Sequence, residues 1–139
     1  MIQIYTTPSC ASCRKAKKWF DQYKIPYSEK NIFSIKLSKE DIFRMLANSE
    51  NGFDDIISTR SKVFKEKKLD PVNMSVQELI EFIIDYPSVL KRPIIINENE
   101  LQVGYNNEDI TIFLPKELRN LDSFSDFDAE PINVKYSKK

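Results

Sequence analysis

Two cysteines three residues apart, Cys10 and Cys13, are the side chains in this 139-residue sequence best suited to chemistry. An apolar, strand-like run at residues 2–5 precedes them, and apolar residues recur at helical spacing after them. The pattern predicts that the pair lies where a strand turns into a helix, with side chains about 5–6 Å apart. Disulfides tolerate Cα separations of about 4.4–6.8 Å, so the spacing predicts a dithiol that can close into a disulfide.

The expected helix start also predicts which sulfur is the more reactive. Unpaired N–H groups and the macrodipole at the amino end of a helix favour an anion. Arg14 and Lys15 add positive charge nearby. We therefore expect Cys10 to be the more thiolate-like of the two cysteines.

Three other interpretations of the pair are a structural zinc half-site, two buried apolar cysteines, and a disulfide that never exchanges. Zinc needs about four ligands, and the sequence has no further cysteine and no histidine. The same absence excludes Ser/His and Cys/His catalysis. A C-x-x-C motif in a reducing compartment is typical of redox chemistry. We expect a redox role without a metal or another cofactor.

Composition restricts the wider function. A length of 139 residues with 41% hydrophobic residues fits one domain with a real core. The 21 basic and 21 acidic residues balance, so the net charge does not favour autonomous nucleic-acid binding. The amino terminus lacks a signal-peptide layout, and no apolar run approaches the roughly 20 residues of a membrane span. We therefore expect a cytoplasmic protein without membrane association.

The elements that must hold the dithiol can be placed from periodicity, caps and breakers. A helix after the cysteines and a break at residues 25–27 give a β-α-β start. The clearest later signal is the capping box formed by Ser75 and Glu78. The expected later elements are a strand to about Ile32, a helix from Ser38 to about Asn48 ended by Asn51-Gly52, one or two short helices over 54–67, a helix from Ser75 to Tyr86, strands at 92–96 and 101–103, and a helix over 106–113 capped by Asn106 or Asn107 and closed by Pro115.

This order predicts an α/β fold, a thioredoxin-like mixed sheet of about four strands. A helical insertion at about residues 35–90 would separate the second and third strands. We expect the domain to span residues 1–120 and residues 121–139 to form a disordered tail. Pro93 lies where a cis proline would be useful beside the thiols, and an ordinary trans proline at a strand start is the alternative.

Several separated motifs together resemble one family. The motifs are YTTPSCASCRKA at 5–16, IISTRSK at 56–62, RPII at 92–95, LQVGYN at 101–106 and FLP at 113–115. The sequence is similar, over about residues 1–120, to the Spx regulators of Firmicutes, which belong to the arsenate reductase-like group of thioredoxin-related folds. The resemblance implies a redox-sensing global transcriptional regulator that is not an enzyme. Such a regulator binds the C-terminal domain of the RNA polymerase α subunit and activates or represses transcription under disulfide or oxidative stress.

The resemblance also implies roles for single residues. Cys10 and Cys13 match the family's switch pair, and Gly52 matches the glycine at its α-subunit contact. Arg92 matches an arginine linked to the oxidised site, and Arg60 matches an anion-binding arginine of the arsenate reductases. Promoter DNA is expected to be reached only through the polymerase complex, and Clp protease or its adaptor is a candidate partner. The further residues expected to support the redox site are Arg14 and Pro93.

Other roles for these residues stay open from the sequence. Gly52 is also typical of a glycine just past a helix end, where a positive φ is needed. Arginines near element ends, such as Arg60 and Arg92, are usually solvated or paired at the surface.

Two stretches depart from the family's pattern. Residues 109–112 are Asp-Ile-Thr-Ile where relatives commonly carry basic residues. The end of the chain at 136–139, Tyr-Ser-Lys-Lys, lacks the apolar terminus that relatives present to Clp protease.

The rival function is an arsenate or thiol-disulfide reductase with Cys10 as the nucleophile. A reductase acting on an oxyanion should gather several cations around the sulfur. Arg60 and Arg92 are the candidates, and no further arginine occurs between Arg92 and Pro115. We therefore expect no meaningful arsenate reduction.

Overall fold

A computed structural model describes residues 1–115 of the chain. These residues belong to two compact units, Met1–Asn106 and the segment that begins at Asn107, and each unit is described by itself. The tail expected at residues 121–139 lies outside the described residues.

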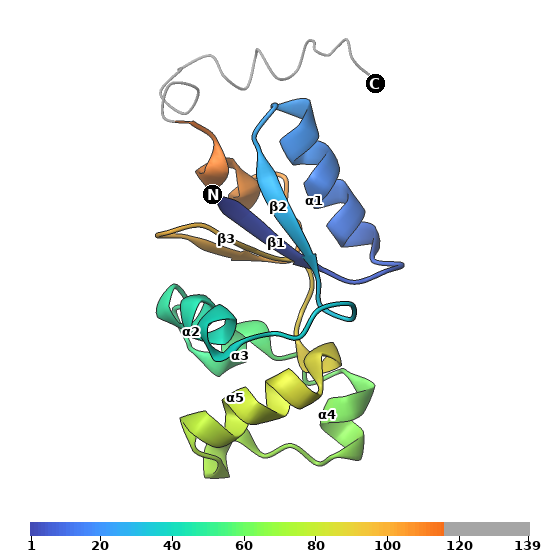
Figure 1. The fold of residues 1–139 in the computed structure, drawn as a ribbon, viewed down its shortest axis with the longest axis vertical. Coiled ribbons are helices and arrows are strands. Elements are labelled where there is room, and N and C mark those ends of the chain that lie inside the picture. The colour runs from blue at the N-terminus through green and yellow to red at the C-terminus, as the bar shows by residue number, and fades with distance from the viewer. Residues whose placement is uncertain (116–139) are drawn as a thin grey trace. The chain divides into compact units, whose positions relative to one another are not determined.

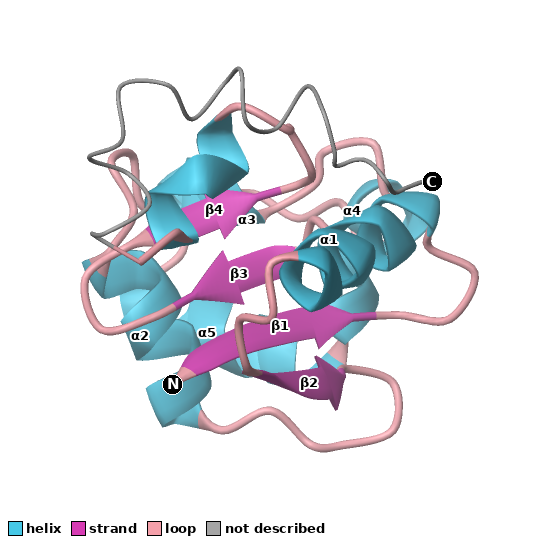
Figure 2. Ribbon diagram, turned by 90° about the horizontal axis from the view of Figure 1, so that it is seen from above, coloured by secondary structure: helices cyan, strands magenta, loops and turns pink. Residues whose placement is uncertain are grey.

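The first unit is built on one mixed sheet with the strand order β2-β1-β3-β4 (Figure 2). β1 pairs in parallel with β2 and antiparallel with β3, and β3 pairs antiparallel with β4. Four helices lie between β2 and β3 in the chain. The expected α/β fold, with about four strands and a helical insertion between the second and third, is therefore confirmed. The strands are β1 (Ile2–Thr6), β2 (Tyr27–Asn31), β3 (Ile94–Ile96) and β4 (Leu101–Val103).

Helix α1 (Ala11–Gln22) covers one face of the sheet, and α2 (Lys39–Ala47) and α5 (Val76–Asp85) pass behind the other (Figure 2). The buried residues of α1 include Cys13, Ala16 and Phe20, whose spacing gives this helix a single apolar stripe. The register of β1 against β2 sets Ile4 opposite Glu29 and Tyr5 opposite Lys30. Because neighbouring strand residues point to opposite faces, these two pairs serve different sides of the sheet.

The helical insertion follows β2 and forms the lower part of the first unit in Figure 1. Capping boxes begin two of its helices: Ser38 with Asp41 at α2, and Ser75 with Glu78 at α5. No helix within residues 1–115 is long and apolar enough to cross a membrane. The helices are α2 (Lys39–Ala47), α3 (Phe53–Ile56), α4 (Lys62–Glu66) and α5 (Val76–Asp85), with 3₁₀ turns η1 (Pro71–Asn73) and η2 (Pro87–Val89).

A buried carboxylate joins the insertion to the sheet. The Asp41 side chain, 7% exposed, accepts hydrogen bonds from the Tyr5 hydroxyl at 2.8 Å, the Lys30 ammonium at 3.1 Å and the Arg44 guanidinium at 3.0 Å. It also caps α2 through the Ser38 N–H at 2.9 Å. Burial alone would raise the pKa of Asp41, but these donors outweigh it and hold the pKa well below its usual range. Burial and the adjacent carboxylate raise the pKa of Tyr5 far above its ordinary value.

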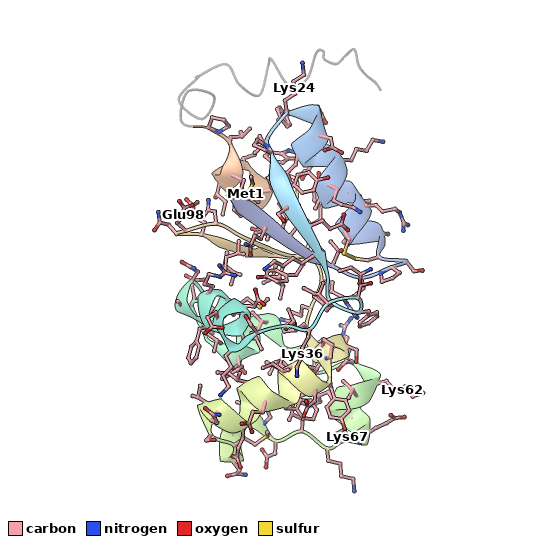
Figure 3. All side chains as sticks on the ribbon, in the orientation of Figure 1. Met1, Lys24, Lys36, Lys62, Lys67 and Glu98 are labelled. Carbon is pink, nitrogen blue, oxygen red and sulfur yellow. A yellow bond between two sulfur atoms is a disulfide. The ribbon has the colours of Figure 1, made fainter. Side chains whose placement is uncertain are left out.

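Apolar packing surrounds this polar junction. Tyr5, Ile94 and Ile96 of the sheet belong to one buried cluster with Ile42 of α2 and Ile83 of α5. Such burial is the main favourable term in folding. Lys62 and Lys67 project from the α4 side of the insertion (Figure 3).

The second unit is described only over its first residues. The helix expected over 106–113 is a 3₁₀ helix, η3 (Asp109–Phe113), and its N-cap is Glu108 without a side-chain cap. The expected asparagine cap was therefore wrong. The Thr111 hydroxyl donates to the Glu108 carbonyl at 2.6 Å. This local bond competes with an α-helical turn, and β-branched neighbours lower helix propensity further.

Candidate functional site

Cys10 and Cys13 form a disulfide at the amino end of α1, with their Cα atoms 5.2 Å apart. Ser9, with φ of 63°, turns the chain between β1 and the helix. Cys10 is the N-cap, and its Sγ accepts a hydrogen bond from the Cys13 N–H at 3.1 Å. Cys13 is only 2% exposed, whereas Cys10 is partly exposed. Cys10 is thus the more accessible sulfur.

A hollow of about 250 Å³ lies beside the two sulfur atoms. Arg14 lines it, and so do Lys17 and Glu29, which the sequence did not single out. The Glu29 carboxylate accepts from the Lys17 ammonium at 3.0 Å and from the Thr6 hydroxyl at 2.8 Å. Desolvation raises the pKa of Glu29, but the bonds from Thr6 and Lys17 leave it below its ordinary value. The strand register and the packing of α1 on the sheet bring these residues together, which is why spacing along the chain did not reveal them.

Arg92 lies in a different hollow, of about 680 Å³, together with Glu50 and Asp55. Its guanidinium carbon is 5.9 Å from the centre of the Phe33 ring, in a cation–π arrangement. Burial lowers the pKa of Arg92 below the usual value for a guanidinium. The Arg92-Pro93 peptide bond is cis, and Pro93 is buried immediately before β3. Arg92 thus does not line the same hollow as the sulfurs.

Arg60 is exposed and lines a third hollow, of about 480 Å³, with Asp54 and Lys91. This hollow contains neither cysteine. The two arginines suggested for an anion site, Arg60 and Arg92, are therefore not gathered with Cys10 in one cavity.

Gly52 is the N-cap of α3, with φ of 65° and ψ of −132°. Helix α2 ends earlier, with Asn48 as its C-cap, so Gly52 begins a helix and does not terminate one. The positive φ explains the glycine nevertheless. The Asp55 carboxylate accepts from the Glu50 and Asn51 N–H groups, at 2.9 Å each, and these bonds hold the loop. Apart from Gly52 itself and its two chain neighbours, no residue within 1–115 has a heavy atom within 4 Å of the position that a Cβ on Gly52 would take.

The chemistry available at this site is that of the dithiol and disulfide. Within residues 1–115, no group of three or more His, Cys, Asp or Glu residues could hold a metal ion. A sulfur at a helix N-terminus, beside the Arg14 cation, which is unpaired among the described residues, is in the environment that lowers thiol pKa values in proteins.

Comparisons with known proteins agree with this fold and motif. A family model described as the ArsC family matches residues 5–113. The Global transcriptional regulator Spx 1 of Bacillus cereus is 50% identical over 119 residues, which cover 86% of this chain and 91% of that protein. The chain belongs to the Spx family. The Global transcriptional regulator Spx of Bacillus subtilis is 48% identical over 120 residues, which cover 86% of this chain and 92% of the other.

Solved structures place this Spx family member among ArsC-like folds. A putative ArsC family related protein from Bacteroides fragilis has a TM-score of 0.69 and 26% identity, covering 78% of this chain and 92% of that one. A putative arsenate reductase from Yersinia pestis has a TM-score of 0.73 and covers 81% of this chain and all of the other. At 18% identity, the second likeness concerns the fold alone.

Proposed function

We propose that this Spx family member is a redox-responsive regulator of transcription that binds the C-terminal domain of the RNA polymerase α subunit. The observation that carries the proposal is the Cys10–Cys13 disulfide at the start of α1, in a chain half identical to a global transcriptional regulator. The regulator would act in the cytoplasm and reach promoter DNA through the polymerase complex. Clp protease or its adaptor stays a predicted partner.

The loop around Gly52 is the proposed contact for the α subunit. It is partly exposed, and Asp55 orders it through two backbone hydrogen bonds. The space around the missing Cβ leaves room for another backbone to approach closely. Because Glu50 and Asp55 share a hollow with Arg92, a partner seated on this loop would also lie near that arginine.

Gly52→Arg tests this contact, with Gly52→Ala as the matched control. Both variants force a side chain onto a positive φ, which costs about 1–3 kcal/mol, so they share the backbone strain. Only arginine adds bulk above the loop. We expect titration of the isolated α C-terminal domain to give at least about a tenfold weaker affinity for Gly52→Arg than for Gly52→Ala.

Circular dichroism and thiol counting should show that both variants fold and oxidise alike. Equal affinities of the two folded variants would remove Gly52 from the interface and contradict the proposed contact.

The proposed switch is closure of the dithiol by a hydroperoxide. The Cys10 thiolate attacks the peroxide, an S–O bond forms, the O–O bond breaks, and the leaving alkoxide or hydroxide takes a proton from solvent. Cys13 then attacks the sulfenic sulfur, and the released hydroxide leaves as water with the proton that Cys13 lost. The sulfurs are oxidised by two electrons, and the peroxide is reduced.

Mass spectrometry of the reduced and then peroxide-treated protein should show the loss of two hydrogens in the peptide that contains both cysteines. Persistent sulfinic acid at Cys10 with Cys13 free would contradict the switch.

A reductase is the second candidate, because the ArsC family model includes both cysteines. The structure supports this candidate poorly, since Arg60 and Arg92 line other hollows and Lys17 is already paired with Glu29. An oxyanion at Cys10 would find Arg14 as the remaining lining cation of its hollow. We expect no arsenate turnover with thioredoxin or glutaredoxin as the reductant. Steady-state turnover that Cys10→Ser abolishes would overturn this expectation.

A further inference from the structure

The two cations at the dithiol stand in matching positions along α1. Arg14 follows Cys10 by four residues, and Lys17 follows Cys13 by four. Side chains four apart on a helix are neighbours, so each cysteine has its own adjacent cation. If both cations acted alike, the spacing would favour the thiolate form of both cysteines equally.

The cations differ in their partners. Lys17 is bound to the Glu29 carboxylate at 3.0 Å, and their side chains are 30% and 38% exposed. The Thr6 hydroxyl holds the same carboxylate oxygen from β1 at 2.8 Å. Arg14, in contrast, has no ion-pair partner within residues 1–115. Thus a positive charge that is not neutralised stands next to Cys10, and a neutralised one stands next to Cys13.

We propose that Glu29 is a positioning residue that neutralises Lys17 and thereby keeps Cys13 the less acidic thiol of the pair. The proposal rests on the redox switch proposed above and assigns the order of its two steps. Cys10, at the N-cap and beside unpaired Arg14, meets the oxidant as a thiolate. Cys13 is still a thiol at that moment, so it escapes direct oxidation and remains able to resolve the sulfenic acid.

The charged groups that line the hollow come from two elements. Arg14 and Lys17 belong to α1, and Glu29 belongs to β2. The groups contributed by β1 and the connecting loop, Thr6 and Ser9 among them, carry no charge. The acidity of Cys13 is therefore set by its own burial, by the helix start, and by the balance of these three charges.

The test measures thiol pKa values by thiolate absorbance in single-cysteine proteins. Cys10→Ser leaves Cys13 alone and retains an oxygen that can cap α1. In that background, Glu29→Gln should lower the pKa of Cys13 by about half to one unit, because Lys17 is then uncompensated. Lys17→Met should raise it by a similar amount, since the carboxylate then acts alone. The double variant should return close to the starting value.

Two comparisons separate this role from a structural one. Lys18→Met removes the same charge from an exposed position on α1 that does not line the hollow, and it should leave the pKa of Cys13 unchanged. In the Cys13→Ser background, Glu29→Gln should shift the pKa of Cys10 less than it shifts that of Cys13. A purely structural effect of the hollow would move both single variants in the same direction.

The proposal is overturned if Glu29→Gln and Lys17→Met shift the pKa of Cys13 in the same direction, or if Lys17→Met has no more effect than Lys18→Met. Neither result depends on RNA polymerase. A protein that fails to bind the α subunit but shows opposite shifts would refute the transcriptional role and keep the charge balance. A protein that binds the α subunit but lacks those shifts would refute the charge balance and keep the transcriptional role.

Discussion

Two carboxylates, Asp41 and Glu29, lie on opposite sides of the same pair of strands and differ in how tightly they are held. Asp41 is 7% exposed and has charged, hydroxyl and backbone donors from β1, β2 and α2. Glu29 is 38% exposed and has two donors, one from β1 and one from α1. Adjacent residues of β1 donate a hydrogen bond to each carboxylate: Tyr5 to Asp41, and Thr6 to Glu29.

The difference indicates that one carboxylate has a structural role and the other an electrostatic one. Removing one partner from a buried charged cluster leaves the others without compensation, so such a cluster fixes the structure in one arrangement. A half-exposed pair contributes little to stability because water screens it. Asp41 therefore attaches the helical insertion to the sheet. Glu29 sets the charge beside the thiols, and replacing it should cost little stability.

The largest expected effect is on stability. Asp41→Ala should lower the free energy of unfolding by about 3 kcal/mol, because the Tyr5 hydroxyl and the Ser38 N–H lose their acceptor and the two partly exposed cations lose their counter-ion. Glu29→Ala should lower it by less than about 1 kcal/mol. Urea unfolding followed by circular dichroism measures both values, and Asp85→Ala, at an exposed position, is the control. Equal losses at Asp41 and Glu29 would remove the distinction between the two sites.

Acid should reveal the same contrast. The folded-state pKa of Asp41 lies below its unfolded value of about 3.9, so its contribution is complete well above that pH. The contribution is lost as the pH falls through the folded pKa, because the unfolded chain takes up the proton first. Between about pH 7 and pH 3, the wild type should therefore lose more stability than Asp41→Asn. Urea midpoints at both pH values test this, and parallel losses would contradict it.

Tyr5→Phe should have a moderate effect. It removes one hydroxyl donor from Asp41 and keeps the ring in the core, so we expect a loss of about 1 kcal/mol. Tyr27→Phe is the matched control, since Tyr27 is only partly buried and lies at the edge of the sheet. A loss no larger than that of the control would mean that the remaining donors satisfy Asp41 without Tyr5.

Lys17→Met should have the smallest effect on stability, about 0.5 kcal/mol or less, although the same change is expected to shift the pKa of Cys13. Thermal unfolding of the reduced protein provides the stability value. A large destabilisation would show that the Lys17–Glu29 pair is structural and would make it resemble Asp41.

Local signals predicted the elements well because their causes are local. The Ser75–Glu78 capping box lies within one helix, α5, and the structure confirms it. The structure also has a Ser38–Asp41 capping box at the start of α2, but the sequence did not reveal the larger role of Asp41. That role depends on Tyr5 of β1 lying beside Lys30 of the neighbouring strand β2. No short sequence pattern encodes this strand register.

The same limit applies to the candidate site. Cys10 and Cys13 were predictable from their spacing, whereas Lys17 and Glu29 meet only through the fold. Gly52 was expected just past the end of a helix. Helix α2 already ends at Ala47, so Gly52 instead begins the next helix, α3. A positive φ satisfies both positions, so glycine alone could not distinguish them.

The position of the sulfur hollow in the chain has a consequence for synthesis. Its lining residues all lie between Thr6 and Asn31, whereas β3, the other neighbour of β1, begins only at Ile94. A nascent chain that has reached β2 thus carries every lining residue but only a two-stranded sheet, which is marginal in water. Until the ribosome has released β3, the thiols are expected to stand in an unfinished fold that nearby chaperones and oxidants can reach. The folded surroundings of the thiols are therefore expected to be complete only after β3 and β4 have been made.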